Sequence, residues 1–184
     1  MIFFLNACVR PQSRTKKLAD RVLAKCGQPY QELRLADLQF PVVDATYLSA
    51  RDDLIARKEF NHPMFEWANQ FAQTEEIIIA APYWDYSFPA VLKQYLEQIN
   101  VVGITFRYTA DGRPVGLCRA SKLTYITTAG GLICPDDFGF GYVQMLARSF
   151  YGIPDVTLIK ASGLDIDGAD EDAILEKALL ESGI

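Results

Sequence analysis

The sequence has no apolar run long enough to cross a membrane. Half of its 184 residues are hydrophobic, but the longest uninterrupted candidates, residues 77–82 and 101–104, are no longer than a strand. A membrane helix needs about 20 apolar residues. The chain opens on apolar residues and shows neither a basic leader nor a small-residue cleavage site, so we expect a first strand rather than a signal peptide. These absences predict a soluble, cytoplasmic protein with no membrane partner.

Cysteine is scarce and scattered along the chain. The four cysteines form no C-x-x-C pair, so the sequence indicates neither a zinc site nor a redox-active dithiol. Reduced, packed thiols are the favoured interpretation. We expect no metal ion.

Basic residues are fewer than acidic ones, 18 against 23. The net charge of −5 argues against nucleic-acid binding, because that binding depends on Lys and Arg neutralising phosphates. The basic residues instead crowd one early segment, at Arg10, Arg14, Lys16, Lys17 and Arg21. A small anionic ligand could be bound there.

Strand-like and helix-like segments alternate from end to end, which is typical of a parallel sheet covered by helices on both faces. Five strands are predicted, at residues 2–8, 30–35, 76–81, 123–128 and 156–161. The third is apolar on both faces, as a central parallel strand should be. Five strands permit the doubly wound order 2-1-3-4-5, in which ligands lie outside the carboxyl ends of the strands. The whole chain, residues 1–184, is expected to form a single domain.

Two segments interrupt this alternation. Residues 39–63 form a long connection in which Pro63 is expected to end one short helix and to begin the next, at residues 64–72. Residues 105–114 contain Asp-Gly and Arg-Pro steps, which favour an extended excursion or a hairpin.

The loop after the first strand could hold a phosphate. Hydroxyls at Ser13 and Thr15, together with the free N–H groups of a helix start, suit a terminal phosphate, with Arg10 or Arg14 adding charge. The loop matches neither the G-x-x-x-x-G-K-[ST] nor the G-x-G-x-x-G motif. An ordinary Ser N-cap with solvated basic residues explains the segment equally well.

The loops after the third and fourth strands carry further unusual residues. Residues 82–89 place four aromatic side chains directly after the most buried strand, which favours a cover for a flat ligand over a local aromatic cluster. Residues 127–131 end in Gly130 and Gly131, which would let the backbone approach a ligand closely, although such a pair is often only a turn.

Several runs resemble a known family. Residues 89–97, the G-I-T-F-R-Y-T run at 103–109, and the segments 116–117, 128–131 and 151–153 are similar to the FMN-dependent NADH-azoreductase and NAD(P)H quinone oxidoreductase family. The resemblance covers residues 75–163, with weaker support around residues 13–19. It implies a flavodoxin-like fold.

The resemblance further implies an FMN-dependent enzyme. It implies a homodimer with two FMN sites and hydride transfer from NAD(P)H through the flavin to a quinone or azo acceptor. Because a flavin can carry the hydride itself, we expect no obligatory side-chain acid or base. The implied FMN contacts are Ser13, Arg14, Thr15, Pro82, Tyr83, Trp84, Asp85, Tyr86, Thr128, Ala129, Gly130 and Gly131. Phe106 and Tyr108 resemble a segment that closes the acceptor pocket near the partner subunit.

Several positions depart from the family pattern. Asp85 stands where Asn is frequent, and its charge is expected to disfavour an anionic reduced flavin. Cys8 replaces a usual Ser, and Ala129 replaces an Arg found in some members. The only histidine, His62, lies in the connection at 39–63, where packing is favoured over catalysis. The acidic pairs 136–137 and 165–167 are interpreted as caps or solvated turns.

Two other functions remain open at this stage. One is a flavodoxin-like electron-transfer or redox-sensing module that lacks NAD(P)H reductase activity. The other is a flavodoxin-like domain that has lost FMN and acts as a binding protein. Bound yellow colour would exclude the second, and NAD(P)H oxidation with a quinone would exclude the first.

Overall fold

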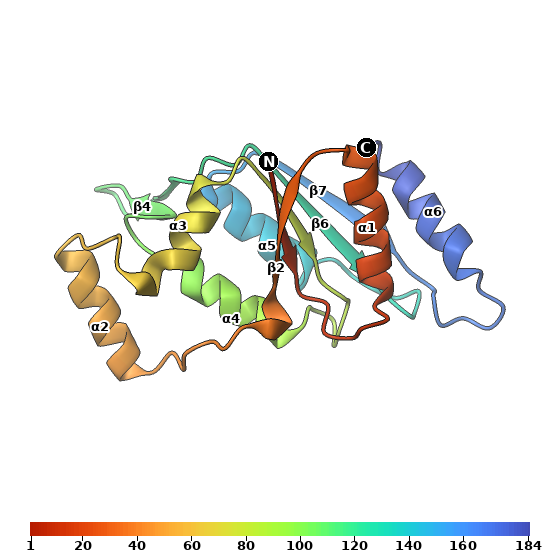
Figure 1. The fold of residues 1–184 in the computed structure, drawn as a ribbon, viewed down its shortest axis with the longest axis horizontal. Helices are drawn as coiled ribbons and strands as arrows, with labels where there is room; N and C mark the ends of the chain where they lie inside the picture. Colours follow the sequence, from red (N-terminus) through yellow and green to blue (C-terminus); the bar gives the residue numbers. More distant parts are fainter.

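The five predicted strands form one parallel sheet in the computed structural model, which describes residues 1–184 (Figure 1). The spatial order is β2-β1-β3-β6-β7, which confirms the predicted order because β4 and β5 lie outside this sheet. The strands are β1 (Ile2–Asn6), β2 (Tyr30–Arg34), β3 (Glu76–Ala80), β6 (Lys122–Thr128) and β7 (Asp155–Ala161).

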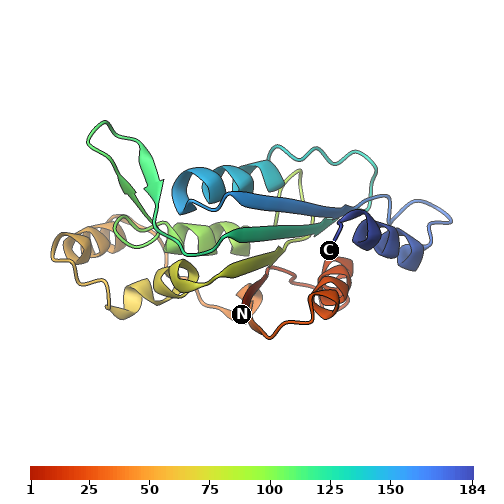
Figure 2. The same cartoon turned by 90° about the horizontal axis from the view of Figure 1, so that it is seen from above.

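Helices cover both faces of this sheet (Figure 2). Alternate residues of a strand point to opposite faces, so Ile2 and Phe4 pack into one apolar cluster while Phe3 and Leu5 pack into another. The first cluster lies under α1 (Arg14–Cys26) and α6 (Glu171–Glu181), and the second under α3 (Glu66–Gln73), α4 (Ala90–Ile99) and α5 (Phe140–Leu146). None of the helices combines the length and apolar character needed to span a bilayer.

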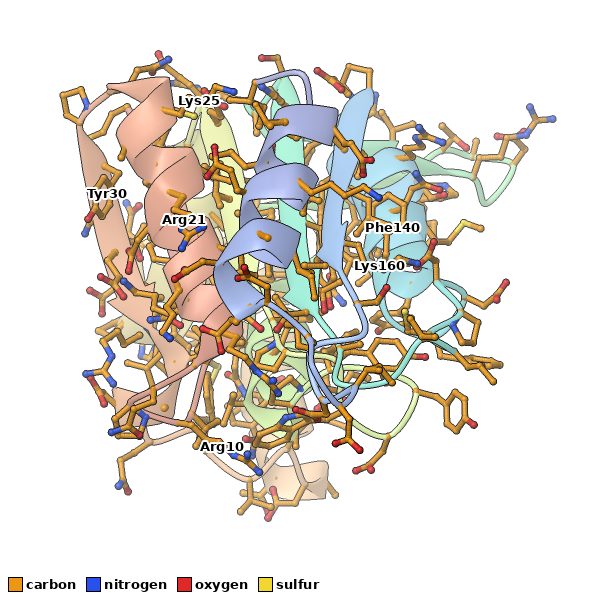
Figure 3. The ribbon with its side chains drawn as sticks, turned by 90° about the vertical axis from the view of Figure 1, so that its right-hand side faces the viewer. Arg10, Arg21, Lys25, Tyr30, Phe140 and Lys160 are labelled. Atoms are coloured by element: carbon orange, nitrogen blue, oxygen red, sulfur yellow. The ribbon has the colours of Figure 1, made fainter.

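Helix α1 follows the sequence pattern closely. Ser13 caps its first turn, and Gly27 ends it with a left-handed φ of 62°, a conformation that glycine adopts without strain. Its polar side carries ion pairs to α6, including Lys17 to Glu171 at 2.6 Å. Figure 3 shows Arg21 of α1 directed toward the neighbouring α6. These two helices therefore form one layer.

The connection between β2 and β3 differs from expectation. It contains the short turns η1 (Leu35–Asp37) and η2 (Pro63–Phe65), with α2 (Ala45–Ala56) between them. Pro63 does begin the turn that leads into α3, but the preceding helix already ends at Ala56. The chain reverses at Lys58, whose φ is +58°. Helix α2 buries only Leu54, so its sequence carries no apolar stripe that would have marked its ends.

The predicted excursion is an antiparallel hairpin made of β4 (Phe106–Tyr108) and β5 (Pro114–Gly116). Its base packs against η3 (Ala147–Tyr151), a wide helical turn that continues α5. The hairpin follows α4, which runs back from the carboxyl edge of the sheet to its amino edge. The hairpin therefore lies at the opposite end of the sheet from the loops that follow the strands (Figure 1).

Candidate ligand cleft

A cleft of about 250 Å³ lies at the carboxyl ends of β1, β3 and β6, where the doubly wound topology predicts a ligand. All three unusual loops contribute to it, together with the loop after β7. Its lining residues are Arg10, Gln12, Ser13, Arg14, Thr15, Pro82, Tyr83, Trp84, Thr128, Gly130 and Asp165.

The loop before α1 forms a tight turn that presents backbone donors. The N–H of Ser13 donates to the carbonyl of Arg10 at 3.2 Å, and Pro11 occupies the second position of this turn, which its fixed φ favours. The Ser13 hydroxyl accepts from the N–H of Lys16 at 3.3 Å. The N–H groups of Arg14 and Thr15 have no acceptor within the chain, so they remain available to an anion at the helix start.

Two of the candidate hydroxyls are bonded to each other. Thr15 Oγ1 and Thr128 Oγ1 lie 2.7 Å apart, and both residues are buried. This bond joins the start of α1 to the end of β6 beneath the cleft. It fixes the distance between the first and third loops.

Arg14 is held by the loop after β7. Its Nη1 donates to the carbonyl oxygen of Leu164 at 3.0 Å and to Asp165 Oδ1 at 2.7 Å. The hydrogen bond and charge of Arg14, helped by the charge of Arg10, lower the pKa of the Asp165 carboxyl below its ordinary value. Asp165 lies in an exposed turn, as expected, but its carboxylate also lines the cleft.

Arg10 lies in the same cleft but makes no hydrogen bond or ion pair through its side chain. Its guanidinium carbon lies over the indole of Trp84, 5.7 Å from the ring centroid, in a cation–π arrangement. Figure 3 shows Arg10 at the edge of the molecule where α1 begins.

The aromatic loop after β3 is a tight two-residue reversal. Trp84 and Ser87 exchange backbone hydrogen bonds, and both central residues are left-handed, Asp85 at φ 50° and Tyr86 at φ 65°. A left-handed Asp is tolerated, but a left-handed Tyr is strained. Pro82, Tyr83 and Trp84 line the cleft, whereas Asp85 and Tyr86 form the exposed tip beside it.

Polar contacts tie this aromatic loop to the loop after β6. The Tyr83 hydroxyl donates to the carbonyl of Pro135 at 3.2 Å, and the Ser87 hydroxyl donates to the carbonyl of Phe138 at 2.8 Å. Lys160 of β7 binds the loop after β6 through the Asp136 carboxylate at 2.7 Å. The acidic pair at 136–137 thus supplies one fixed ion-pair partner.

The glycines after β6 have different surroundings. A Cβ on Gly130 would lie 1.8 Å from Asp165 Oδ2, while one on Gly131 would meet nothing within 4 Å. Gly130 lines the cleft, whereas Ala129 is buried and Gly131 faces open space. Gly130 therefore lets the Asp165 side chain approach, a role that the sequence did not indicate.

Phe106 and Tyr108 lie away from this cleft. Phe106 is buried at the amino edge of the sheet, where it stacks on Phe150 with ring centroids 4.3 Å apart. Tyr108 is 51% exposed on the hairpin. Neither side chain lines the cleft of its own chain.

Cys8 and His62 also lie outside the cleft lining. Cys8 is buried, its thiol donates to the carbonyl of Ala80 at 3.8 Å, and burial raises its pKa to about 11. His62 accepts from the N–H of Met64 and caps η2. Gln12 and Asp165 are cleft residues that the sequence analysis did not select, since nothing in their local sequence distinguishes them from turn residues.

Comparison with known proteins gives a consistent picture. Residues 1–182 match the model of a family described as having a flavodoxin-like fold. The chain is 34% identical to an FMN-dependent NADH:quinone oxidoreductase of Clostridium beijerinckii, over 97% of this chain and 93% of that protein. A relative of the same description from Clostridium acetobutylicum is 33% identical over 97% of this chain and 94% of its own.

Solved structures agree on the fold. An azoreductase from Bacillus anthracis superposes with a TM-score of 0.85 at 23% identity, covering 98% of this chain and 95% of the other. Because the family model matches residues 1–182 and the sheet has the predicted strand order, the chain belongs to the flavodoxin-like fold family.

Proposed function

We propose that this protein is an FMN-dependent NADH:quinone oxidoreductase that also accepts azo compounds. The observation that carries the proposal is the 34% identity, over 97% of the chain, to an FMN-dependent NADH:quinone oxidoreductase. The cleft at the carboxyl edge supports it, because its donors and aromatic side chains suit the two chemically different ends of FMN.

The anionic end of FMN fits the start of α1. The free N–H groups of Arg14 and Thr15 and the unpaired guanidinium of Arg10 are donors of the kind that a phosphate prefers. These residues would bind the phosphate, and the Ser13 cap keeps the helix start in the conformation that exposes its donors.

The flat end of FMN fits the aromatic loop. Tyr83 and Trp84 give the cleft aromatic ring surface, and Thr128 and Gly130 line it as well. Bound FMN supplies hydride acceptance and donation, while the protein supplies position and electrostatics. We propose that these loops orient the ring and exclude water from one side of it. That no side chain acts as an obligatory acid or base stays a prediction.

We further propose a homodimer. The hairpin that carries Tyr108 stands at the opposite end of the sheet from the cleft, so it could close a cleft only on a second copy of the chain. Apolar side chains near the hairpin base support this arrangement, since Val102 and Leu117 are each 38% exposed. The single domain of residues 1–184 would then act as one subunit, in the cytoplasm where NADH is available.

Absorbance spectroscopy tests the proposed function. The purified protein, supplied with FMN and freed of excess, is expected to show the flavin bands, which NADH should bleach under anaerobic conditions. Addition of a small quinone should then restore the bands repeatedly. Absence of flavin binding would refute the proposal, whereas bound flavin that NADH does not bleach would favour an electron carrier. Light scattering of the same sample tests the dimer.

A further inference from the structure

We propose that Arg10 is the arginine that recognises the FMN phosphate, and that Arg14, neutralised by Asp165, instead holds the wall of the cleft. This inference rests on the proposed function and assigns different tasks to two basic residues of one loop. Arg14 is the residue that the motif suggests, since it lies between Ser13 and Thr15.

Arg14 is already committed within the chain. Its Nη1 contacts both the Leu164 carbonyl and the Asp165 carboxylate, so its charge is compensated at 2.7 Å. This contact crosses from the first turn of α1 to the loop after β7. An ion pair of this kind has no net charge to offer an incoming dianion.

The hydroxyls beside Arg14 carry no charge, and each is already part of one hydrogen bond. Ser13 Oγ accepts from the helix N–H of Lys16, and the Thr15 hydroxyl is bonded to Thr128. The donors that remain at the helix start are the Ser13 O–H and the backbone N–H groups of Arg14 and Thr15, none of which carries a formal charge. Neutral donors form weaker hydrogen bonds to a phosphate than a cationic side chain does. A cation at this site would therefore add affinity that these donors do not supply.

Arg10 is the uncompensated charge. The charged residues that line the cleft are two arginines and one aspartate, which leaves a single net positive charge there. Arg10 has no carboxylate within ion-pair distance, and its charge makes only the smallest contribution to the lowered pKa of the Asp165 carboxyl. The positive charge of Arg10 is therefore left uncompensated in the cleft.

The position of Arg10 also suits this task. Its carbonyl accepts from the Ser13 N–H, so the residue belongs to the turn that exposes the helix donors. Its guanidinium rests on the Trp84 indole, which limits its motion while leaving its N–H groups free. A preordered cation loses less freedom on binding.

The experiment compares FMN with riboflavin, which lacks only the phosphate. Flavin-free protein is titrated with each flavin, and dissociation constants are read from quenching of flavin fluorescence. Arg10→Gln is expected to weaken FMN binding by about tenfold or more, the usual loss for a hydrogen bond to a charged group. Riboflavin binding should change by less than about threefold, because the phosphate contact is absent from both proteins.

The matched control removes the other pair of charges together. Arg14→Gln combined with Asp165→Asn leaves the net charge of the cleft unchanged and keeps an amide donor facing an amide acceptor, so FMN binding should weaken clearly less than in Arg10→Gln. The dependence of FMN binding on salt should be reduced in Arg10→Gln and retained in this double variant. Should the double variant fail to fold, Asp165→Asn alone serves, and it should bind FMN at least as tightly as wild type.

Several outcomes would overturn the inference while leaving the proposed function intact. One is a loss of FMN binding in the double variant as large as that in Arg10→Gln. Another is an equal loss of FMN and riboflavin in Arg10→Gln, which would make Arg10 a cover for the ring. A third is weaker FMN binding in Asp165→Asn. A wild-type protein that binds neither flavin would instead refute the proposed function itself.

Discussion

Gly130 and Gly131 offer the sharpest test of how the cleft is built. They are adjacent and chemically identical, but a Cβ added to Gly130 would lie 1.8 Å from Asp165 Oδ2, 2.6 Å from its Cγ and 3.2 Å from its Cβ. The conflict therefore involves the whole carboxylate, not only its tip. The Asp165 backbone cannot retreat easily, because its N–H donates to the Gly130 carbonyl at 3.0 Å.

In Gly130→Ala the Asp165 side chain must turn away and release Arg14. Asp165 is 66% exposed, so the lost ion pair and the strain together should lower the free energy of unfolding by only about 1 kcal/mol. For a chain of this length that corresponds to a fall in melting temperature of about 2–4 °C. FMN binding should weaken too, since the displaced carboxylate and the added methyl group enter the cleft.

Gly131→Ala is the matched control. Its Cβ would meet nothing within 4 Å and its φ is not positive, so the unfolding free energy should change by no more than about 0.5–1 kcal/mol, and toward greater stability. Thermal and urea unfolding of both variants measure the contrast. Adding Asp165→Ala to each variant completes the test, because the penalty at Gly130 should shrink once the carboxylate is gone. Equal stabilities of the two glycine variants, or a Gly130→Ala penalty that persists without Asp165, would refute the reasoning.

Three further predictions follow from the same structure. Gly116→Ala would place a Cβ 2.2 Å from the backbone N of Gly152, so it should lower stability in urea unfolding by about 1–3 kcal/mol; an unchanged midpoint would contradict this packing. Asp165 has a lowered pKa, so its pairing with Arg14 stabilises the fold above about pH 4, the unfolded value, and this contribution is lost as pH falls through the lower folded value. Wild type should therefore exceed Asp165→Asn in stability at pH 7 and lose that lead near pH 3. The Cys8 thiol, with its pKa raised to about 11, should resist iodoacetamide at pH 8 in the folded protein, as mass spectrometry would show.

The sheet and most of its helices could be predicted because their signals are local. The apolar run at residues 76–81 predicts a buried strand, and the amphipathic pattern of residues 13–26 predicts a helix and the face that it buries. The hairpin was likewise marked by its Asp-Gly step, and Gly112 has a φ of +80° there. Helix α2 gave no such signal, because it packs through one buried leucine.

The candidate site was predictable only in outline. Loops that follow parallel strands meet at one edge, so the convergence of the first and third loops follows from topology. Which side chains enter the cleft depends on pairing between loops. Asp165 comes from the loop after β7 and is placed by a backbone hydrogen bond to Gly130, a contact between residues far apart in sequence. Reading the segment 165–167 by itself could not reveal it.

The cleft is organised before any ligand arrives, and this changes what its polar residues do. The Thr15–Thr128, Arg14–Asp165 and Tyr83–Pro135 contacts each join two different loops, so these groups are occupied in fixing the cleft rather than free for a ligand. Loops held in place lose little conformational entropy when a cofactor binds. Binding strength would then come from the few donors left unused, which are the N–H groups at the start of α1, the Ser13 O–H and the guanidinium of Arg10.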